Sequence, residues 1–234
     1  MQTPSHQESR TNATVPRVSV VDDDPWEAAY TRFETPEQEI RKFIGRLRAL
    51  GAEKWPRESQ IVELFCGRGN GLHALFRLGF EKIEGVDLSP RLAALYQGPA
   101  KCYVCDCRRL PFADRSKDVL IVQGGLHHLP TLPGSLEETL VEMRRVLRRD
   151  GRLVVVEPWS TPFLTFVHAV SEIPLARRMW GKLDALATMT EYERPTYERW
   201  LGSPKLVSGV MRANFRPLYE TFGWGKWKFV GSPL

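Results

Sequence analysis

The stretch ELFCGRGNG, residues 63–71, decides the fold of this chain, because it places three glycines on alternate positions directly behind a short apolar run. Residues 61–65 have the composition of a buried strand. Glycines behind such a strand make a tight turn into a helix, and their backbone can approach a ligand closely. The stretch predicts a strand–turn–helix unit that either binds a ligand at the turn or serves only as a tight connection.

Short apolar runs alternate with helical segments from this turn to residue 157. Short buried strands that alternate with helices form a parallel sheet covered on both faces. The predicted fold class is therefore α/β, doubly wound and mostly parallel. We expect helices over 71–78, 90–96 and 136–147, and strands over 61–65, 82–86, 101–104, 119–123 and 152–157.

The segments before this region predict a tail and a helical cap. Residues 1–20 are polar with few core-forming side chains, so we expect a disordered tail. Residues 21–60 form the predicted N-terminal helical cap. Its main helix starts at Thr35 and Pro36, a capping residue followed by a first-turn proline, and ends near Gly51.

Residues 61–234 form the predicted main domain, which changes character after Pro158. We expect a helical insertion on the substrate side over 159–203, because segments longer than a minimal connection often build binding loops. Residues 163–189 predict two helices divided near Pro174. Two apolar runs near the C-terminus, separated by a Gly-Trp-Gly turn, predict an antiparallel hairpin over 218–222 and 226–230.

Composition limits the class of protein. With 234 residues and 42% hydrophobic content, the chain can bury one substantial core. No apolar run approaches the ~20 residues that a membrane-spanning helix needs, and the N-terminal segment has no apolar signal region. We therefore expect a cytoplasmic protein with reduced cysteines. The excess of 33 basic over 28 acidic side chains is too small to indicate a nucleic-acid partner by itself.

The residues around the glycine turn favour a nucleoside ligand. A dinucleotide site needs Gly or Ala where this chain has Leu72, and the Gly-Lys-Ser/Thr ending of a P-loop is missing. Asp87 follows Gly67 by 20 positions at the end of the next strand, where a carboxylate accepts hydrogen bonds from both hydroxyls of a ribose. Its alternative role is a helix cap before Ser89 and Pro90.

Four segments together resemble one family. ELFCGRGNG, EGVDLSP, CDCRRLPFADRSKDVLIVQGGLHHL and RVLRRDGRLVVVEP, which lie within residues 61–158, are similar to motifs of the class I S-adenosylmethionine-dependent methyltransferases. The resemblance is to the small-molecule branch that includes the quinone methyltransferases. It implies a Rossmann-like methyltransferase fold with a seven-stranded sheet, and S-adenosyl-L-methionine as cofactor. One position departs from the family pattern, because Phe65 stands where members usually have Gly.

The resemblance also implies roles for residues near the methionine and ribose parts of the cofactor. Glu63, Gly67 and Gly69 would frame the methionine moiety. Asp87 would hold the ribose.

Further roles follow for the adenine and the reactive methyl group. Leu88 would pack on the adenine, Asp106 would accept a hydrogen bond from its amino group, and Cys107 would supply a backbone N–H. Gln123 and Gly124 would lie beside the methionine amino group and the methyl.

Two other groups of residues suggest chemistry. His127 and His128 follow the fourth predicted strand, so an imidazole could take a proton from an acceptor, or the pair could only pack the loop. Cys102 should face away from Cys105 and Cys107, because side chains alternate along a strand. The cysteines also have no second pair at zinc-site spacing, so we expect no metal.

The sequence thus predicts a methyltransferase that acts on an O, N or C nucleophile of a small organic acceptor. The sulfonium is reactive, so alignment and exclusion of water can supply much of the acceleration. Two alternatives stay open. One is a nucleic-acid methyltransferase or binder, with strongly salt-dependent affinity. The other is a module that binds the cofactor without turnover.

Overall fold

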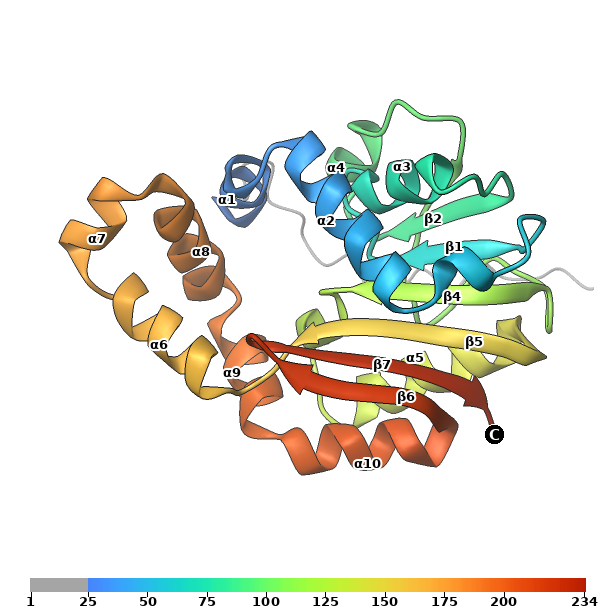
Figure 1. Cartoon of the computed structure of the whole chain (residues 1–234). Coiled ribbons are helices and arrows are strands. Elements are labelled where there is room, and N and C mark those ends of the chain that lie inside the picture. The colour runs from blue at the N-terminus through green and yellow to red at the C-terminus, as the bar shows by residue number, and fades with distance from the viewer. Residues whose placement is uncertain (1–24) are drawn as a thin grey trace, which may run out of the picture.

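A seven-stranded sheet forms the centre of the molecule (Figure 1). The computed structural model describes residues 25–234, so the predicted tail over 1–20 and the first residues of the predicted cap lie outside the described residues. The strand order is β3-β2-β1-β4-β5-β7-β6. The strands are β1 (Ile61–Leu64), β2 (Ile83–Asp87), β3 (Lys101–Val104), β4 (Lys117–Gln123), β5 (Leu147–Pro158), β6 (Phe215–Gly223) and β7 (Lys226–Pro233).

The direction of the strands confirms the predicted fold class. β1 to β5 pair in parallel, whereas β7 runs antiparallel to both β5 and β6 and forms the predicted C-terminal hairpin. β1 pairs with β2 on one side and with β4 on the other, so the strand order reverses there. Ligands of doubly wound sheets bind outside the carboxyl ends of the strands at such a reversal.

Helices cover both faces of the sheet (Figure 1). On one face, α2 (Pro36–Ala49) and α3 (Asn70–Arg77) bury a cluster of apolar side chains against the sheet. On the other, α5 (Gly134–Val146) and α10 (Pro204–Asn214) bury a second cluster. All four residues of β1 are buried, because a central parallel strand is covered on both faces. The short α4 (Pro90–Ala94) lies between β2 and β3 in the chain.

The main helix of the predicted cap forms as its sequence indicates. The Thr35 side chain accepts a hydrogen bond from the Gln38 backbone, and the Gln38 side chain accepts one from the Thr35 backbone, so the two residues make a capping box. Gly51 adopts a left-handed φ of 86° behind the helix and leads into the short η1 (Ala52–Lys54). A further helix, α1 (Pro25–Phe33), precedes α2 and packs against α8 of the insertion.

The prediction of two helices over 163–189 is wrong, since the chain forms three there. They are α6 (Pro162–Ser171), α7 (Pro174–Met179) and α8 (Gly181–Tyr192), and α9 (Arg194–Gly202) follows. Pro174 starts α7, as expected for a first-turn proline. The second break falls at Trp180, whose extended backbone (φ −133°, ψ 92°) ends α7. Helix α10 was not predicted.

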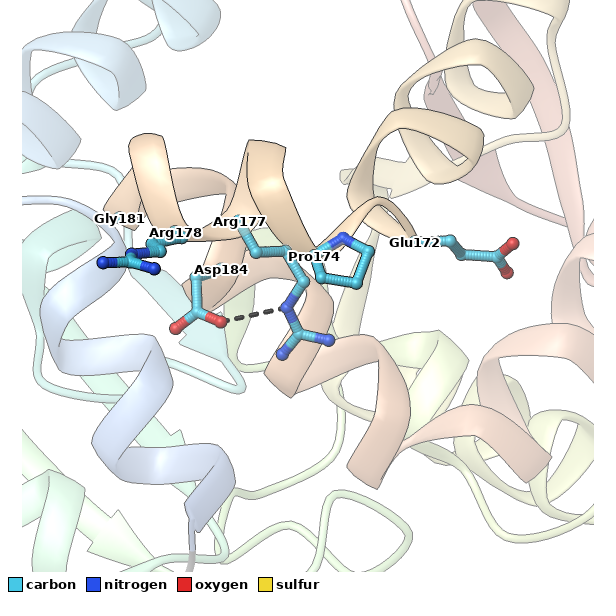
Figure 2. A pocket seen from close by; sticks show the side chains of 6 residues that line it. All are labelled: Glu172, Pro174, Arg177, Arg178, Gly181 and Asp184. Carbon is cyan, nitrogen blue, oxygen red and sulfur yellow. Dashed lines mark hydrogen bonds and ion pairs between the residues drawn. The ribbon is translucent and has the colours of Figure 1, made fainter.

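The insertion, residues 159–203 with helices α6 to α9, projects from the sheet (Figure 1). Its helix α8 contacts α1. Figure 2 shows Arg177 of α7 bonded to Asp184 of α8, at 3.0 Å, beside a pocket between these helices. Asp184 also pairs with Arg32 of α1 at 2.8 Å, and Lys182 pairs with Glu34 at 2.6 Å. These ion pairs connect three segments. Within residues 25–234, the helices are all too short or too polar to cross a bilayer.

Candidate cofactor and acceptor site

The carboxyl ends of β1 and β4 bring together two polar side chains, the buried Glu63 and the partly buried Gln123. The Gln123 Nε2 group donates to Glu63 Oε1 at 3.2 Å. The remaining oxygens, Glu63 Oε2 and Gln123 Oε1, are buried and have no hydrogen-bond partner among the described residues. Buried polar atoms are nearly always paired in native proteins. The Gln123 oxygen is an acceptor, and so is the Glu63 oxygen once the carboxyl group is ionised, so a ligand with several N–H donors, such as an ammonium group, would satisfy both.

Burial sets the protonation of Glu63 in the ligand-free chain. Desolvation raises the pKa of its carboxyl group to about 8, and the hydrogen bond from Gln123 opposes this only in part. The carboxyl group lies over the start of α3, where a Cβ on Gly71 would come within 1.9 Å of Glu63 Oε1. Gly71 therefore leaves the room that the Glu63 side chain occupies.

We predict that the Glu63→Gln variant loses part of the pH dependence of folding stability. Between the unfolded pKa near 4.5 and the folded pKa of about 8, the folded chain keeps a proton that the unfolded chain releases, so stability falls as pH rises through this window. A glutamine does not titrate. Thermal unfolding of the cofactor-free chain from pH 5 to pH 9 measures the effect. Identical pH profiles for the two proteins would contradict the assignment of this proton to Glu63.

The glycine turn between β1 and α3 has left-handed backbone at Gly67 (φ 52°) and Gly69 (φ 77°), which glycine adopts without steric cost. A Cβ on Gly67 would lie 3.2 Å from the Tyr30 hydroxyl oxygen. A Cβ on Gly69 would lie 2.2 Å from the ring of Tyr96. Gly67 thus permits the approach of α1, and Gly69 permits the close packing of Tyr96 against the turn.

Phe65, the residue that directly follows β1, has a φ of 57°. Positive φ is rare for a bulky side chain and costs about 1–3 kcal/mol. Its ring lies against Gly125, where a Cβ would come within 2.3 Å of Phe65 Cγ. Gly125 therefore provides the space that the aromatic ring needs.

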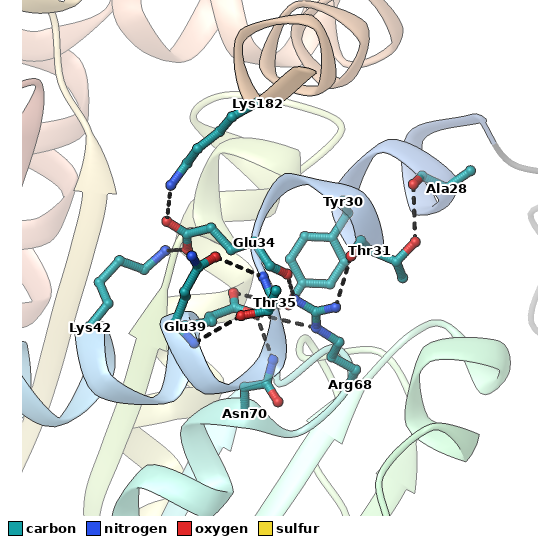
Figure 3. Close-up of polar contacts among 11 residues, drawn as sticks. Ala28, Tyr30, Thr31, Glu34, Thr35, Glu39, Lys42, Arg68, Asn70 and Lys182 are labelled. Carbon is teal, nitrogen blue, oxygen red and sulfur yellow. Dashed lines mark hydrogen bonds and ion pairs between the residues drawn. The ribbon is translucent and has the colours of Figure 1, made fainter. Parts of the chain in front are cut away.

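A buried polar network fixes the glycine turn to the N-terminal helices (Figure 3). Arg68 Nη2 forms a buried ion pair with Glu39 Oε2 of α2 at 2.9 Å. Asn70 donates to the same oxygen at 2.7 Å, and the Tyr30 hydroxyl donates to the same carboxylate. Arg68 also donates to the carbonyl oxygens of Thr31 and Glu34. The turn is therefore held in place by both α1 and α2.

Asp87, at the end of β2, binds the backbone of the glycine turn. Its Oδ2 accepts from the Gly67 N–H at 2.6 Å, and its Oδ1 accepts from the Ser89 N–H at 2.8 Å. Burial raises the pKa of this carboxyl group, and the backbone hydrogen bonds oppose the shift. Each oxygen keeps a second lone pair for a ligand. The next residue, Leu88, has 56% of its surface exposed, so an apolar side chain borders the same edge of the sheet.

The loop after β3 holds Asp106 in an ion pair. Arg108 Nη2 lies 2.6 Å from Asp106 Oδ2, and Arg108 Nε lies 3.0 Å from Oδ1. This guanidinium lowers the pKa of the Asp106 carboxyl group. An adenine amino group would have to share the carboxylate with Arg108.

The cysteines separate onto the two faces of the sheet as predicted. Cys102 packs with the cluster under α2 and α3, whereas Cys105 and Cys107 pack with the opposite cluster. The Cys107 thiol is buried 3.8 Å from Thr139 Oγ1, and burial raises its pKa to about 12. These three cysteines therefore do not form one ligand set.

His127 lies in η2 (Leu126–His128), the turn that follows β4 and Gly124. Its Nδ1 lies 2.7 Å from Oε2 of the fully buried Glu157. Glu157 Oε1 accepts from the backbone N–H groups of Gly125 and Leu126, at 2.7 and 2.8 Å. A carboxylate only accepts hydrogen bonds, so Nδ1 carries a proton and Nε2 is the ring nitrogen that faces away from Glu157. Three hydrogen bonds to one carboxylate thus fix the ring.

Glu193, between α8 and α9, joins both imidazoles and α1. Its carboxylate lies 3.8 Å from His127 Nε2 and 3.3 Å from His128 Nδ1. The Trp26 indole N–H donates to it at 2.8 Å. Burial raises the pKa of Glu193 and lowers that of His128. Sequence reasoning missed Glu193, because it lies 65 residues beyond His128 in an insertion with no motif.

The strand order and the glycine turn at the strand reversal define a Rossmann-like methyltransferase fold. Residues 62–155 match the family described as "Methyltransferase domain". A protein of Pyrococcus horikoshii has a similar structure, with a TM-score of 0.60, 19% identity, and coverage of 84% of this chain and 92% of that one. The 1,6-didemethyltoxoflavin N1-methyltransferase of Burkholderia thailandensis was solved with S-adenosylhomocysteine. It gives a TM-score of 0.52 at 18% identity, and the match covers 84% of this chain and 79% of that one.

Curated relatives agree with this class. The ubiquinone/menaquinone biosynthesis C-methyltransferase UbiE of Geotalea uraniireducens is 33% identical over 97 residues, which are 38% of this chain and 39% of the relative. The demethylmenaquinone methyltransferase of Beutenbergia cavernae is 37% identical over 120 residues, which are 50% of this chain and 46% of the relative. These matches thus span about half of each relative or less. The domain match over residues 62–155, the curated relatives and the fold together support a class I S-adenosylmethionine-dependent methyltransferase.

The residues at the strand ends fit the cofactor of this class, S-adenosylmethionine. The unpartnered oxygens of Glu63 and Gln123 match the amino group of a methionine moiety in charge and in hydrogen-bonding type. Asp87 has the chemistry to accept from ribose hydroxyls.

Proposed function

We propose that this protein transfers the methyl group of S-adenosylmethionine to an oxygen, nitrogen or carbon nucleophile on a small organic acceptor. The observation that carries the proposal is the pair of unpartnered buried acceptors, Glu63 Oε2 and Gln123 Oε1, at the strand reversal. They lie at the carboxyl ends of neighbouring parallel strands, and Asp87 ends the strand on the other side of β1. A ligand with an ammonium group at one end and a ribose further along suits this arrangement.

The roles of the cofactor residues follow from this arrangement. Glu63 and Gln123 accept from the methionine amino group, with the backbone of Gly124 alongside. Gly67 and Gly69 keep the turn compact, so that its backbone borders the methionine moiety. Their left-handed backbone supports this role.

The other end of the cofactor lies beyond β2. Asp87 accepts from the ribose hydroxyls through its free lone pairs, and Leu88 packs on the adenine. Asp106 and the Cys107 N–H contact the adenine edge, with Arg108 sharing the Asp106 carboxylate. The exposure of Leu88 supports an apolar contact there.

When bound, the cofactor would supply an electrophilic methyl group. The acceptor nucleophile provides the electron pair of the new bond, and the pair of the broken sulfur–methyl bond stays on the sulfur. The protein aligns the two reactants and excludes water, which accounts for much of the acceleration. Helix α1 supports this role, since Tyr30 lies over Gly67 and Trp26 reaches Glu193 of the insertion. The same helix thus contacts both the glycine turn and the insertion.

The acceptor binds between the end of β4 and the insertion. His127 and His128 are the candidate catalytic residues, because they follow β4 and meet the insertion at Glu193 and at Tyr197, whose ring contacts His127. Two curated relatives are named as quinone methyltransferases, which supports a ring compound of quinone type as the acceptor.

Calorimetric titration tests the proposal against its alternatives. We expect S-adenosylmethionine and S-adenosylhomocysteine to bind, and NAD to show no heat of binding. A second assay follows labelled methyl transfer to a panel of small ring compounds and to bulk RNA. Label on a small molecule supports the proposal. Label on RNA only would favour the nucleic-acid alternative, and binding without any transfer would favour the non-catalytic module.

A further inference from the structure

Three ligand atoms converge at the acceptor side of the site. They are His127 Nε2, His128 Nδ1 and a carboxylate oxygen of Glu193, and all lie within 4.8 Å of one another. Glu193 Oε1 is 3.8 Å from His127 Nε2, and Glu193 Oε2 is 3.3 Å from His128 Nδ1. We propose that these three residues bind one divalent transition-metal ion.

The surroundings of His127 are those of a metal ligand. A metal-binding imidazole usually donates its other N–H to a carboxylate, which fixes the ring and its tautomer. Glu157 does this for His127 at 2.7 Å. Glu157 is itself fixed by two backbone N–H groups at the end of β4. His127 Nε2 is therefore the ring nitrogen left for a ligand, and it faces Glu193.

The donor set selects the kind of ion. Two imidazole nitrogens and one carboxylate oxygen suit Zn²⁺ and its first-row neighbours, rather than Mg²⁺ or Ca²⁺, which prefer oxygen ligands. Such ligands stand about 2.0–2.2 Å from the ion, so neighbouring donor atoms come to roughly 3–4 Å apart. The distance from each Glu193 oxygen to its nearest imidazole nitrogen falls in this range, and an ion would draw the three ligand atoms, which lie within 4.8 Å of one another, closer together. Three protein ligands leave at least one position open.

The charges in this region also suit a cation. Glu157 and Glu193 place two carboxyl groups on the same imidazole. Lys226, at the start of β7, adds a positive charge nearby, and burial lowers its pKa to about 8. Among the described residues, none has a carboxylate oxygen within 4.0 Å of the Lys226 ammonium. The two carboxyl groups are therefore not neutralised by a direct ion pair with lysine.

The position of the ion specifies the acceptor further, and this step rests on the proposed function. The ligands come from the turn after β4 and from the insertion, the two segments that border the acceptor space. An open coordination position there would bind an oxygen of the acceptor, such as a phenolate, an enolate or a carboxylate. The imidazoles would then act through the ion rather than by proton transfer.

Metal titration of the full chain tests the site. The chain, freed of any affinity tag and treated with a chelator, is titrated with Zn²⁺ by calorimetry and with Co²⁺ by visible absorption. We expect one ion per chain and the absorption bands of nitrogen- and oxygen-ligated Co²⁺. His128→Ala and Glu193→Gln should each weaken Zn²⁺ binding at least tenfold. His168→Ala is the matched control, because His168 lies in the insertion but bonds Tyr197 instead, at 3.2 Å.

Glu157→Gln gives an independent readout, since loss of an orienting carboxylate usually costs 10- to 100-fold in metal affinity. Circular dichroism verifies that each variant is folded. No stoichiometric Zn²⁺ binding by the unmodified chain, or equal affinity in Glu193→Gln, would overturn the proposal. The same metal-free chain is titrated with S-adenosylhomocysteine, so a failed metal site with intact cofactor binding leaves the proposed function standing.

Discussion

The Asp87→Ala variant should bind S-adenosylhomocysteine about a hundredfold more weakly than the unmodified chain. Hydrogen bonds to a charged group contribute about 1.5–3 kcal/mol each, and two are lost with the carboxylate, where every 1.4 kcal/mol is a factor of ten in affinity. Asp87 also accepts from the Gly67 N–H at 2.6 Å, so its loss releases the glycine turn as well. Calorimetric titration of both proteins measures the change.

Asp114 provides the control for this variant. Its side chain is 74% exposed and pairs with Arg145 on the surface, where ion pairs contribute about 0–1 kcal/mol. Asp114→Ala should therefore bind the ligand as the unmodified chain does. The N-cap of α4 is Ser89, so the alternative role of Asp87 as a helix cap is wrong. An Asp87→Ala variant with unchanged affinity would show that the carboxylate serves only to hold the Gly67 and Ser89 backbone.

The Trp200→Ala variant should lower the free energy of unfolding by about 3–5 kcal/mol, the usual cost of removing a fully buried tryptophan. Trp200 of α9 is 1% exposed, and its indole N–H donates to the Pro158 carbonyl at 2.9 Å. The variant would leave a cavity and an unpaired carbonyl oxygen where the insertion joins β5. Urea denaturation monitored by circular dichroism measures the loss.

Trp224→Ala is the matched substitution. Trp224 lies in the turn between β6 and β7 and is 82% exposed, with a ring contact to Phe163. Surface substitutions of this kind usually change stability by about 0.5 kcal/mol or less. Equal losses from the two variants would contradict the packing described for α9.

The alternation of apolar runs and glycine turns allowed most of the sheet to be predicted. Strand and helix positions after Ile61 follow from local hydrophobic patterns, and β3 was predicted with its observed bounds. β5 begins at Leu147 rather than at residue 152, because its polar first residues extend past the apolar run that marks a buried strand. The start of such a strand is determined by backbone pairing with the neighbouring strand, here Leu147 with Lys117 of β4, and not by side-chain hydrophobicity.

Contacts between distant segments could not be predicted. Glu193 and Trp26 meet because α1 packs on α8, and neither has a motif around it. The ion pair of Arg68 with Glu39 is similar, since both positions look like ordinary surface charges in the sequence. Phe65 departs from the family pattern, and only the structure shows that Gly125 makes room for it.

A crystal structure with S-adenosylhomocysteine tests the central claim most directly. We predict its amino group within hydrogen-bonding distance of Glu63 and Gln123, its ribose hydroxyls on Asp87, and its sulfur facing the space bordered by His127 and Glu193. A nucleoside bound elsewhere, with the Glu63 and Gln123 oxygens still unpartnered, would contradict the account.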